Sequence, residues 1–467
     1  MKRLVTLLTL LVMMLGLIAA CGPQPVAEEP SPTDEAVVEP MEEPTEPIAE
    51  EPTPVIPTEE PEETEEPEEM EEPEETEEPE ETEEPEDAVP PVGEFEGLIK
   101  IATQSPLSGP QAAIGVGIRN GAELGVEQLA DPLTSLGFTV ELAPFDDQAQ
   151  AEVGTANANN IASDPDILCV DGHLNSGVAL AALPTYSNAS VPMVSPANTN
   201  PNITEGGYEV AFRIVGRDDV QGAVAEQFAR EQLNIESVFI IHDQTDYGQG
   251  VAEFFRQNAE ENGITVLGFE GTQEQSVFDS ILTPIQATNP DLIYFGGIYS
   301  QAGPLFAQAR DRGITAQFLG PDGLDNAELV TLAGEAVADM YYTSVAAPVS
   351  QFPAAAQFAE DYQSRYNAPA PPFSAQSYDA VGICVQAIAQ AAEDAGGKPT
   401  REQVLEALRN LDTFEGITGT YDFNDIGDPT EATYFVLQVN YDPENPEEGW
   451  NENAVVERLT IAPPEPQ

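Results

Sequence analysis

The chain has few of the residues from which catalytic and metal sites are built. Its 467 residues include two histidines, three cysteines and one tryptophan. The sequence contains no His/Cys cluster with metal-ligand spacing, and no HExxH, Gly-x-Ser-x-Gly or P-loop motif. We therefore expect no metal, no cofactor and no catalysis.

Positive charge is also scarce. The chain carries 15 basic side chains against 84 acidic ones, and from Glu94 onward the numbers are 13 and 54. A surface of that sign repels the phosphate backbone of nucleic acids. We therefore expect no nucleic-acid partner.

The histidines and the two later cysteines form no evident site. His173 and His242 end separate predicted strands, far apart in the sequence. Cys169 lies in a strand-like apolar run and Cys384 in a helical one, and both have the character of small buried hydrophobes. A bridge between these cysteines is compatible with an oxidising compartment, but their spacing does not indicate one.

The longest apolar run lies at the N-terminus. It extends from Leu4 to Ile18 behind two basic residues, and two alanines then precede Cys21. This order is typical of an export signal, and about 15 apolar residues are fewer than the ~20 of a relaxed transmembrane helix. The junction resembles the lipobox of bacterial lipoproteins. This resemblance implies a signal peptide at 1–20, a lipid anchor on Cys21 and a location outside the cytoplasmic membrane. The alternatives are an ordinary signal peptide and a membrane anchor that happens to end in cysteine.

Residues 21–95 form an acidic, proline-rich segment. Between Glu59 and Asp87 the sequence Glu-Glu-Pro-Glu-Glu-Thr repeats every six residues. Such a segment has too few apolar groups to offset the entropy of ordering the chain, and its prolines and like charges favour an extended conformation. We predict a disordered tether. Divalent-cation binding is the weaker alternative, since a flexible repeat fixes no coordination geometry.

From Glu96 onward strand-like and helix-like stretches alternate. We predict helices at 111–129, 149–162 and 175–187, and strands at 98–103, 138–145, 167–170, 237–242, 264–269, 291–295, 316–319 and 340–343. This alternation predicts an α/β fold with parallel sheets covered on both faces, and its length predicts two lobes. Ligands in such folds bind where the carboxyl ends of strands meet helix N-termini.

Three predicted loops carry polar groups suited to a small zwitterion. Ser176 opens a helix, so its hydroxyl and the free N–H groups of that helix end can receive a carboxylate. The proline-bracketed loop 195–201 offers the Ala197 carbonyl and the Thr199 hydroxyl, and Asp322 in a later turn is suited to an ammonium group. As alternatives, Ser176 and Thr199 can act as helix caps and Asp322 as a turn former.

Eight short motifs follow one another along this region: Pro106-Leu-Ser-Gly109, Phe145-Asp-Asp147, Gly172-His-Leu174, Ser195-Pro-Ala-Asn-Thr199, His242-Asp-x-x-x-Tyr247-Gly, Gly296-Gly297, Phe318-Leu-Gly-Pro-Asp-Gly323 and Tyr378-Asp-Ala-Val381. In order and spacing the chain resembles, over about 97–440, the leucine/isoleucine/valine-type substrate-binding proteins of branched-chain amino acid ABC importers. The resemblance implies a type I periplasmic binding protein, with two Rossmann-like α/β lobes joined by three hinge strands that close on a ligand in the cleft.

The same resemblance gives the lobe limits. Lobe 1 is expected to comprise 96–216 and 346–413, and lobe 2 to comprise 217–345 and 414–455, followed by a disordered tail at 456–467. Gly416–Gly419 and Phe423–Asp428 resemble the last hinge crossing and the strand that completes lobe 2.

The ligand-binding positions of the family carry over residue by residue. Ser176 and Thr199 match the positions that hold the ligand α-carboxylate, and Ala197 gives its carbonyl. Asp322 stands where the family has an acidic residue for the α-ammonium. Tyr247 matches an aromatic from lobe 2 that closes over the ligand.

The pocket for the ligand's side chain departs from the family pattern. Phe373 matches an aromatic of this pocket, and Leu174 and Asn175 are further expected contacts. Ile114 and Ile298 stand where the leucine/isoleucine/valine proteins carry tyrosines. These changes preserve the zwitterion clamp but alter the part of the site that reads the side chain.

We interpret the chain as a monomeric extracytoplasmic receptor anchored through Cys21. It is expected to capture an amino acid, aliphatic or branched-chain, and to deliver it to an ABC permease and its ATPase. Two alternatives stay open. One is a sensor for amino acids, amides or urea that feeds a signalling partner, and the other is an enzyme with His173 or His242 as its general base.

Overall fold

The computed structural model describes residues 95–465. The signal peptide, Cys21 and nearly all of the tether expected from the sequence lie outside the described residues. Among residues 95–465, no helix combines the length and hydrophobicity required to cross a bilayer.

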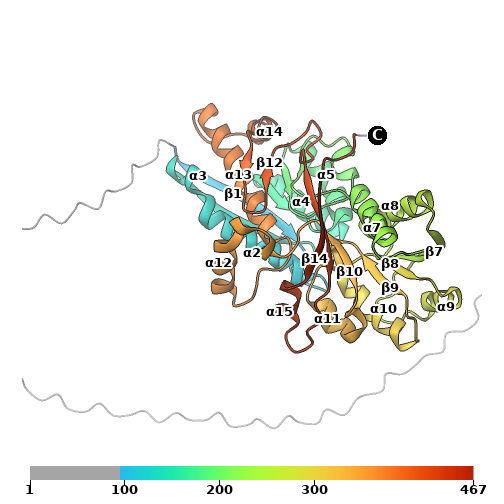
Figure 1. Cartoon of the computed structure of the whole chain (residues 1–467). Coiled ribbons are helices and arrows are strands. Elements are labelled where there is room, and N and C mark those ends of the chain that lie inside the picture. The colour runs from blue at the N-terminus through green and yellow to red at the C-terminus, as the bar shows by residue number, and fades with distance from the viewer. Residues whose placement is uncertain (1–94, 466–467) are drawn as a thin grey trace, which may run out of the picture. The chain divides into compact units, whose positions relative to one another are not determined.

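Lobe 1 is built on a five-stranded parallel sheet in the order β2-β1-β3-β4-β5. The strands are β1 (Gly97–Ser105), β2 (Phe138–Asp146), β3 (Ile167–Gly172), β4 (Met193–Ser195) and β5 (Ala211–Arg213). Its helices are α2 (Ala112–Leu129), α3 (Asp131–Ser135), α4 (Ala151–Ser163), α5 (Ser176–Asn188), α6 (Asn202–Glu205), α12 (Ala356–Tyr366), α13 (Ser374–Ala395) and α14 (Arg401–Arg409). Figure 1 shows α13 lying beside α2 although most of lobe 2 separates them in the sequence.

Lobe 2 is built on a seven-stranded sheet in the order β14-β13-β10-β9-β8-β6-β7. Its strands are β6 (Ser237–His242), β7 (Thr265–Gly271), β8 (Leu292–Gly296), β9 (Gln317–Gly320), β10 (Tyr341–Ser344), β13 (Ala432–Gln438) and β14 (Ala454–Ile461). Around it lie α7 (Asp218–Glu231), α8 (Asp246–Asn262), α9 (Asp279–Thr288), α10 (Tyr299–Asp311), the short helix η1 (Asp322–Leu324), α11 (Glu328–Ala333) and α15 (Pro446–Asn451). The prediction of an α/β fold with two lobes is confirmed.

Two expectations for lobe 2 were wrong. The sheet is mixed, because β13 and β14 join it antiparallel to their neighbours. The strand that completes the lobe after the last crossing is β13, beyond Phe423–Asp428, and β14 extends to Ile461 in the segment expected to be a disordered tail. Alternation of strands and helices cannot reveal such additions, because β13 and β14 follow one another with only a short helix between them.

The chain crosses between the lobes three times: after β5, after β10 and before β13. The first and third crossings are tied together by one buried carboxylate. Asp428 lies 2.7 Å from the Arg213 Nε and accepts a hydrogen bond of 2.9 Å from the Arg217 Nη1. A shared counterion of this kind fixes where the two crossings meet.

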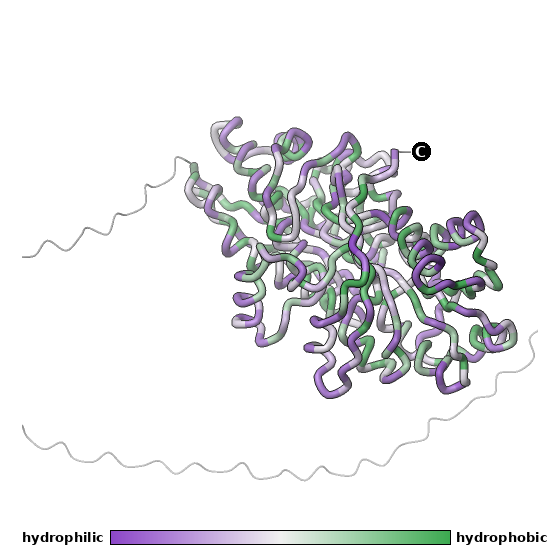
Figure 2. Tube along the Cα trace, viewed as in Figure 1, coloured by the Kyte–Doolittle hydropathy of each residue, from purple (hydrophilic) through white to green (hydrophobic). Residues whose placement is uncertain are grey.

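Local sequence explains several helix ends near the crossings and the cleft. Thr245 caps α8 by accepting a hydrogen bond from the Gly248 amide, and Gly263 ends that helix with a φ of 92°. Such a left-handed ending favours glycine. In Figure 2, hydrophobic and hydrophilic residues alternate along most helices, as expected for helices that bury one face.

A disulfide joins Cys169 of β3 to Cys384 of α13, with Cα atoms 6.0 Å apart and both residues fully buried. The expectation of two unpaired apolar cysteines was therefore wrong. The sequence separation is 215 residues. Periodicity predicted that each cysteine would be buried, but only the packing of α13 on the lobe 1 sheet decides that they meet.

Candidate functional site

The loops expected to hold a ligand carboxylate lie together at the carboxyl ends of β3 and β4. Asn198 ties them to each other, since its Oδ1 accepts from the His173 amide at 3.2 Å and its Nδ2 donates to the Leu174 carbonyl at 2.9 Å. Ser176 and Thr199, one from each loop, are both 1% exposed. Their hydroxyl oxygens have no hydrogen-bond partner within residues 95–465. Buried polar atoms are rarely left unpaired, so these two are suited to a ligand.

Ser176 is also the first residue of α5, a 13-residue helix whose free N–H groups favour an anion. The cap position is Asn175, whose Nδ2 donates to the Gln111 Oε1 at 2.7 Å. Because Asn175 makes no side-chain cap bond to α5, the amides at this helix end stay available. The alternative of Ser176 as a plain helix cap is therefore not what the structure shows.

Opposite this end, lobe 2 presents a buried carboxylate. The Asp322 Oδ1 accepts hydrogen bonds from the Gln221 Nε2 at 2.8 Å and the Tyr247 hydroxyl at 3.0 Å. The Tyr247 hydroxyl in turn accepts from the Gly323 amide at 2.7 Å. Burial raises the pKa of Asp322 to about 6, against the opposing effect of these hydrogen bonds.

A second carboxylate, Asp218, was missed by the sequence analysis. It opens α7, it is fully buried, and neither of its oxygens forms a well-aligned hydrogen bond in the described part of the chain, although the nearby Thr199 hydroxyl opposes the rise of its pKa. Its amide donates to the Thr199 carbonyl at 2.9 Å, so it borders the carboxylate loop. Burial and then the charge of Asp322 raise the pKa of Asp218 well above its usual value.

The arrangement of Asp218 could not be read from its neighbours in the sequence. In Arg217-Asp218-Asp219, an acidic residue at a helix start has an ordinary explanation in the helix dipole. The sequence offered one signal: two aspartates share the first turn of α7, while a single one is enough to interact with the helix dipole. The structure separates them, because Asp219 pairs with Arg217, whereas Asp218 forms no hydrogen-bonded ion pair and feels only the more distant charge of Arg213.

The remaining predicted contacts form an apolar wall. Ile114, Ile298 and Phe373 are buried in one continuous hydrophobic cluster with Ala197 and Tyr247, which therefore draws on both lobes. Leu174 packs against the same cluster and is half-buried. Six of the ten residues predicted for the ligand thus belong to this cluster or pack against it, and their role as ligand contacts stays a prediction.

The imidazole rings of both histidines form their hydrogen bonds away from Asp218 and Asp322. His173 is fully buried, with its Nδ1 3.0 Å from the Gln104 Nε2 and 3.6 Å from the Asp147 Oδ2. His242 accepts from the Gln244 amide and stacks beside Phe269. Neither histidine contacts Asp218 or Asp322 in these hydrogen bonds.

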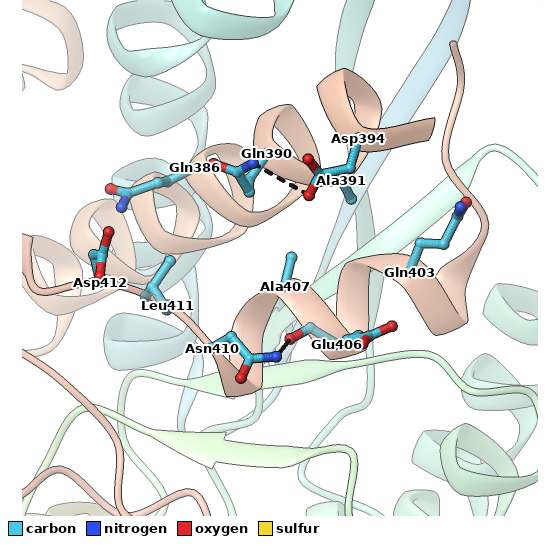
Figure 3. Close-up of a pocket in the computed structure, with 10 residues that line it drawn as sticks. All are labelled: Gln386, Gln390, Ala391, Asp394, Gln403, Glu406, Ala407, Asn410, Leu411 and Asp412. Atoms are coloured by element: carbon cyan, nitrogen blue, oxygen red, sulfur yellow. Dashed lines mark hydrogen bonds between the residues drawn. The ribbon is translucent and has the colours of Figure 1, made fainter. Parts of the chain in front are cut away.

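Figure 3 shows a separate pocket of about 470 Å³ between α13 and α14. Glutamine, asparagine and acidic side chains line most of it, and none of the predicted ligand contacts does. In the part of the chain that the structure describes, no three His, Cys, Asp or Glu residues are grouped to hold a metal ion.

Comparison with known proteins agrees with this geometry. A family model described as "Periplasmic binding protein" matches residues 98–445. A leucine-, isoleucine-, valine-, threonine- and alanine-binding protein of Pseudomonas aeruginosa is 32% identical over 345 residues, covering 74% of this chain and 90% of that protein.

Solved structures give the same result. A leucine-binding protein of Thermotoga maritima has a TM-score of 0.68 at 29% identity, covering 78% of this chain and 99% of that one. A branched-chain amino acid transporter substrate-binding protein of Streptococcus pneumoniae, in complex with isoleucine, has a TM-score of 0.67 at 25% identity, covering 79% and 100%.

Proposed function

This chain belongs to the periplasmic binding protein family, and we propose that it captures a small aliphatic amino acid between its lobes for an ABC importer. The family consists of extracytoplasmic solute-binding proteins and not of enzymes. The relatives are named for binding leucine, isoleucine, valine, threonine and alanine. Transfer of the cargo to a permease and its ATPase follows the transporter context of the isoleucine-bound relative.

One observation supports this proposal above all others: two unpaired hydroxyls and one unpaired carboxylate are buried at one site. The Ser176 and Thr199 hydroxyls and both Asp218 oxygens have no partner among the described residues. A zwitterionic amino acid supplies both missing partners, since its carboxylate accepts from the hydroxyls and its ammonium donates to Asp218 and Asp322. Leaving these groups buried and unpaired would be costly, so the ligand stabilises the closed arrangement.

The apolar wall supports an aliphatic side chain on this amino acid. Ile114, Ile298 and Phe373 carry no polar side-chain atoms, and they belong to the buried cluster that adjoins Ala197. A charged side chain placed against them would lose its hydration without gaining a partner. Binding then shifts the population of open and closed lobes, with no bond made or broken.

Calorimetric titration of the whole chain, stripped of bound ligand by unfolding and refolding, tests this function. We expect one-to-one binding of one or more of leucine, isoleucine, valine, threonine and alanine. Binding of urea or short amides alone would contradict the role of the two carboxylates. If none of these compounds binds, the result would contradict the proposed function and favour a sensor for another ligand.

The affinity for amino acids is expected to fall below about pH 6. Burial raises the pKa of Asp322 to about 6 and that of Asp218 above its usual value, so the empty site takes up protons in this range. An ammonium group needs anionic carboxylates, and its binding must then release those protons. Protonation of Asp322 alone should lower the affinity at pH 5 about tenfold relative to pH 7, and protonation of Asp218 should add to this loss. Titrations at both pH values measure this, and equal affinities would contradict it.

We also propose that Cys21 carries the lipid anchor and that the acidic tether separates the receptor from the membrane. The arrangement of the N-terminal sequence supports both parts. Metabolic labelling with radioactive palmitate should mark the wild-type chain and leave Cys21→Ala unmarked. Equal labelling of both chains would contradict lipidation at Cys21.

A further inference from the structure

Besides the contacts beside the crossings, such as the bond from the Asp218 amide to the Thr199 carbonyl, two further hydrogen bonds join the lobes. Neither of these two uses a group that is expected to touch the ligand. The Tyr299 hydroxyl, at the start of α10 in lobe 2, donates to the Pro110 carbonyl in lobe 1 at 3.0 Å. The Asn200 Nδ2, after β4 in lobe 1, donates to the Asp246 carbonyl at the start of α8 in lobe 2 at 2.8 Å. These four residues are called the latch.

Close packing accompanies the second of these bonds. A Cβ atom on Gly177 of α5 would lie 2.8 Å from the Asp246 Oδ2, and one on Gly250 of α8 would lie 3.2 Å from the Asn200 Nδ2. The N-terminal turns of α5 and α8 thus approach each other across the cleft. Asn200 is 6% exposed and Tyr299 is fully buried, so both donors have left water in this arrangement.

Each latch donor is the chain neighbour of a predicted ligand contact. Asn200 follows Thr199, and Tyr299 follows Ile298. One acceptor shows the same relation, since Asp246 precedes Tyr247. A movement that brings the ligand contacts onto the cargo therefore brings the latch atoms within reach of each other.

We propose that the latch sets the lifetime of the closed, loaded receptor, with Tyr299 and Asn200 as positioning residues that act on the ligand only through lobe closure. The inference rests on the proposed function. Both bonds require the lobes to be closed, so they form after the ligand has entered. Breaking them is part of opening, so their loss should appear in the dissociation rate and much less in the association rate.

The test uses two variants of the whole chain and one control. Tyr299→Phe removes a single hydroxyl. Asn200→Asp keeps the Oδ1 that accepts from the Asn202 amide at 2.9 Å, but it removes the donor to Asp246. Tyr342→Phe is the matched control, because its buried hydroxyl accepts from the Asn453 Nδ2 at 2.8 Å within lobe 2.

Stopped-flow rates with leucine or isoleucine as the probe should separate the three variants. Tyr299→Phe is expected to dissociate about threefold to tenfold faster, as the loss of one hydrogen bond predicts, with its association rate and ligand-free melting temperature unchanged. Asn200→Asp should dissociate faster still, because its added charge faces the Asp246 carbonyl oxygen. The control should melt at a lower temperature and dissociate at the wild-type rate. Wild-type dissociation rates in both latch variants would overturn the proposal.

A second readout keeps the latch testable without a ligand. Fluorescent labels on Asn160 of lobe 1 and Glu261 of lobe 2, both exposed, report the distance between the lobes by energy transfer. If the wild type binds no amino acid, the proposed function fails, and the ligand-free distances decide on the latch. Longer distances in Tyr299→Phe than in the control support it, and equal distances overturn it.

Discussion

Replacing Asp218 by asparagine is expected to weaken amino-acid binding at least about a hundredfold while making the ligand-free protein more stable. The carboxylate is fully buried and both of its oxygens lack donors in the described residues. Removing one member of a buried charge pair with the ligand ammonium costs several kcal/mol, and a hundredfold corresponds to about 2.7 kcal/mol.

The gain in stability has the same physical origin. Without a ligand, Asp218 is a buried charge close to Asp322, and burial with that neighbouring charge raises its pKa. An asparagine side chain has nearly the same volume and no charge, so it removes the cost of burying an unpaired anion. Sites that bind by holding unpaired groups ready commonly reduce stability in this way.

The control is Asp325→Asn, another fully buried aspartate of lobe 2. Its oxygens accept from the Ser344 hydroxyl at 2.7 Å and the Trp450 Nε1 at 2.8 Å, so it is already satisfied within lobe 2. This variant should lower the melting temperature and leave the affinity within about twofold. Calorimetric titration and thermal unfolding measure both quantities. Wild-type affinity in Asp218→Asn would show that Asp218 does not contact the ligand ammonium.

Removing the disulfide is expected to lower the free energy of unfolding by roughly 2–5 kcal/mol without changing the affinity. The bond closes a loop of 215 residues, and constraining so long a loop in the unfolded chain is worth about 5 kcal/mol in the chain-entropy model. The loop contains the main part of lobe 2, while both sulfurs lie in the core of lobe 1. Removal of the bond should therefore lower the free energy of unfolding and leave the geometry of the cleft unchanged.

The double variant Cys169→Ala/Cys384→Ala tests this by denaturant unfolding, with the reduced wild type as a second sample. Neither cysteine belongs to the apolar wall of the site, so titration with an amino acid should give wild-type affinity for both samples. Unchanged unfolding free energies would show that the two segments of lobe 1 hold together without the bond. A loss of affinity would show that this core also positions the cleft.

The sequence by itself determined most strands of the two parallel series and the loops that carry polar groups, but not β13 or β14. The predicted strand at 237–242 is β6 to the residue, and the others lie within about two residues of their predicted ends. The reason is that hydrophobic periodicity and turn residues act locally. Ser176, Thr199 and Asp322 were found in the same way, because each follows directly after an apolar strand.

Only the tertiary structure decided which distant groups meet. It paired Cys169 with Cys384. It formed an ion pair between Arg217 and Asp219, whereas the neighbouring Asp218 forms none. It also set Tyr299 against the Pro110 carbonyl across the cleft. Burial, pairing and the loss of hydration depend on what packs around a side chain, and that is fixed by chain segments up to hundreds of residues away.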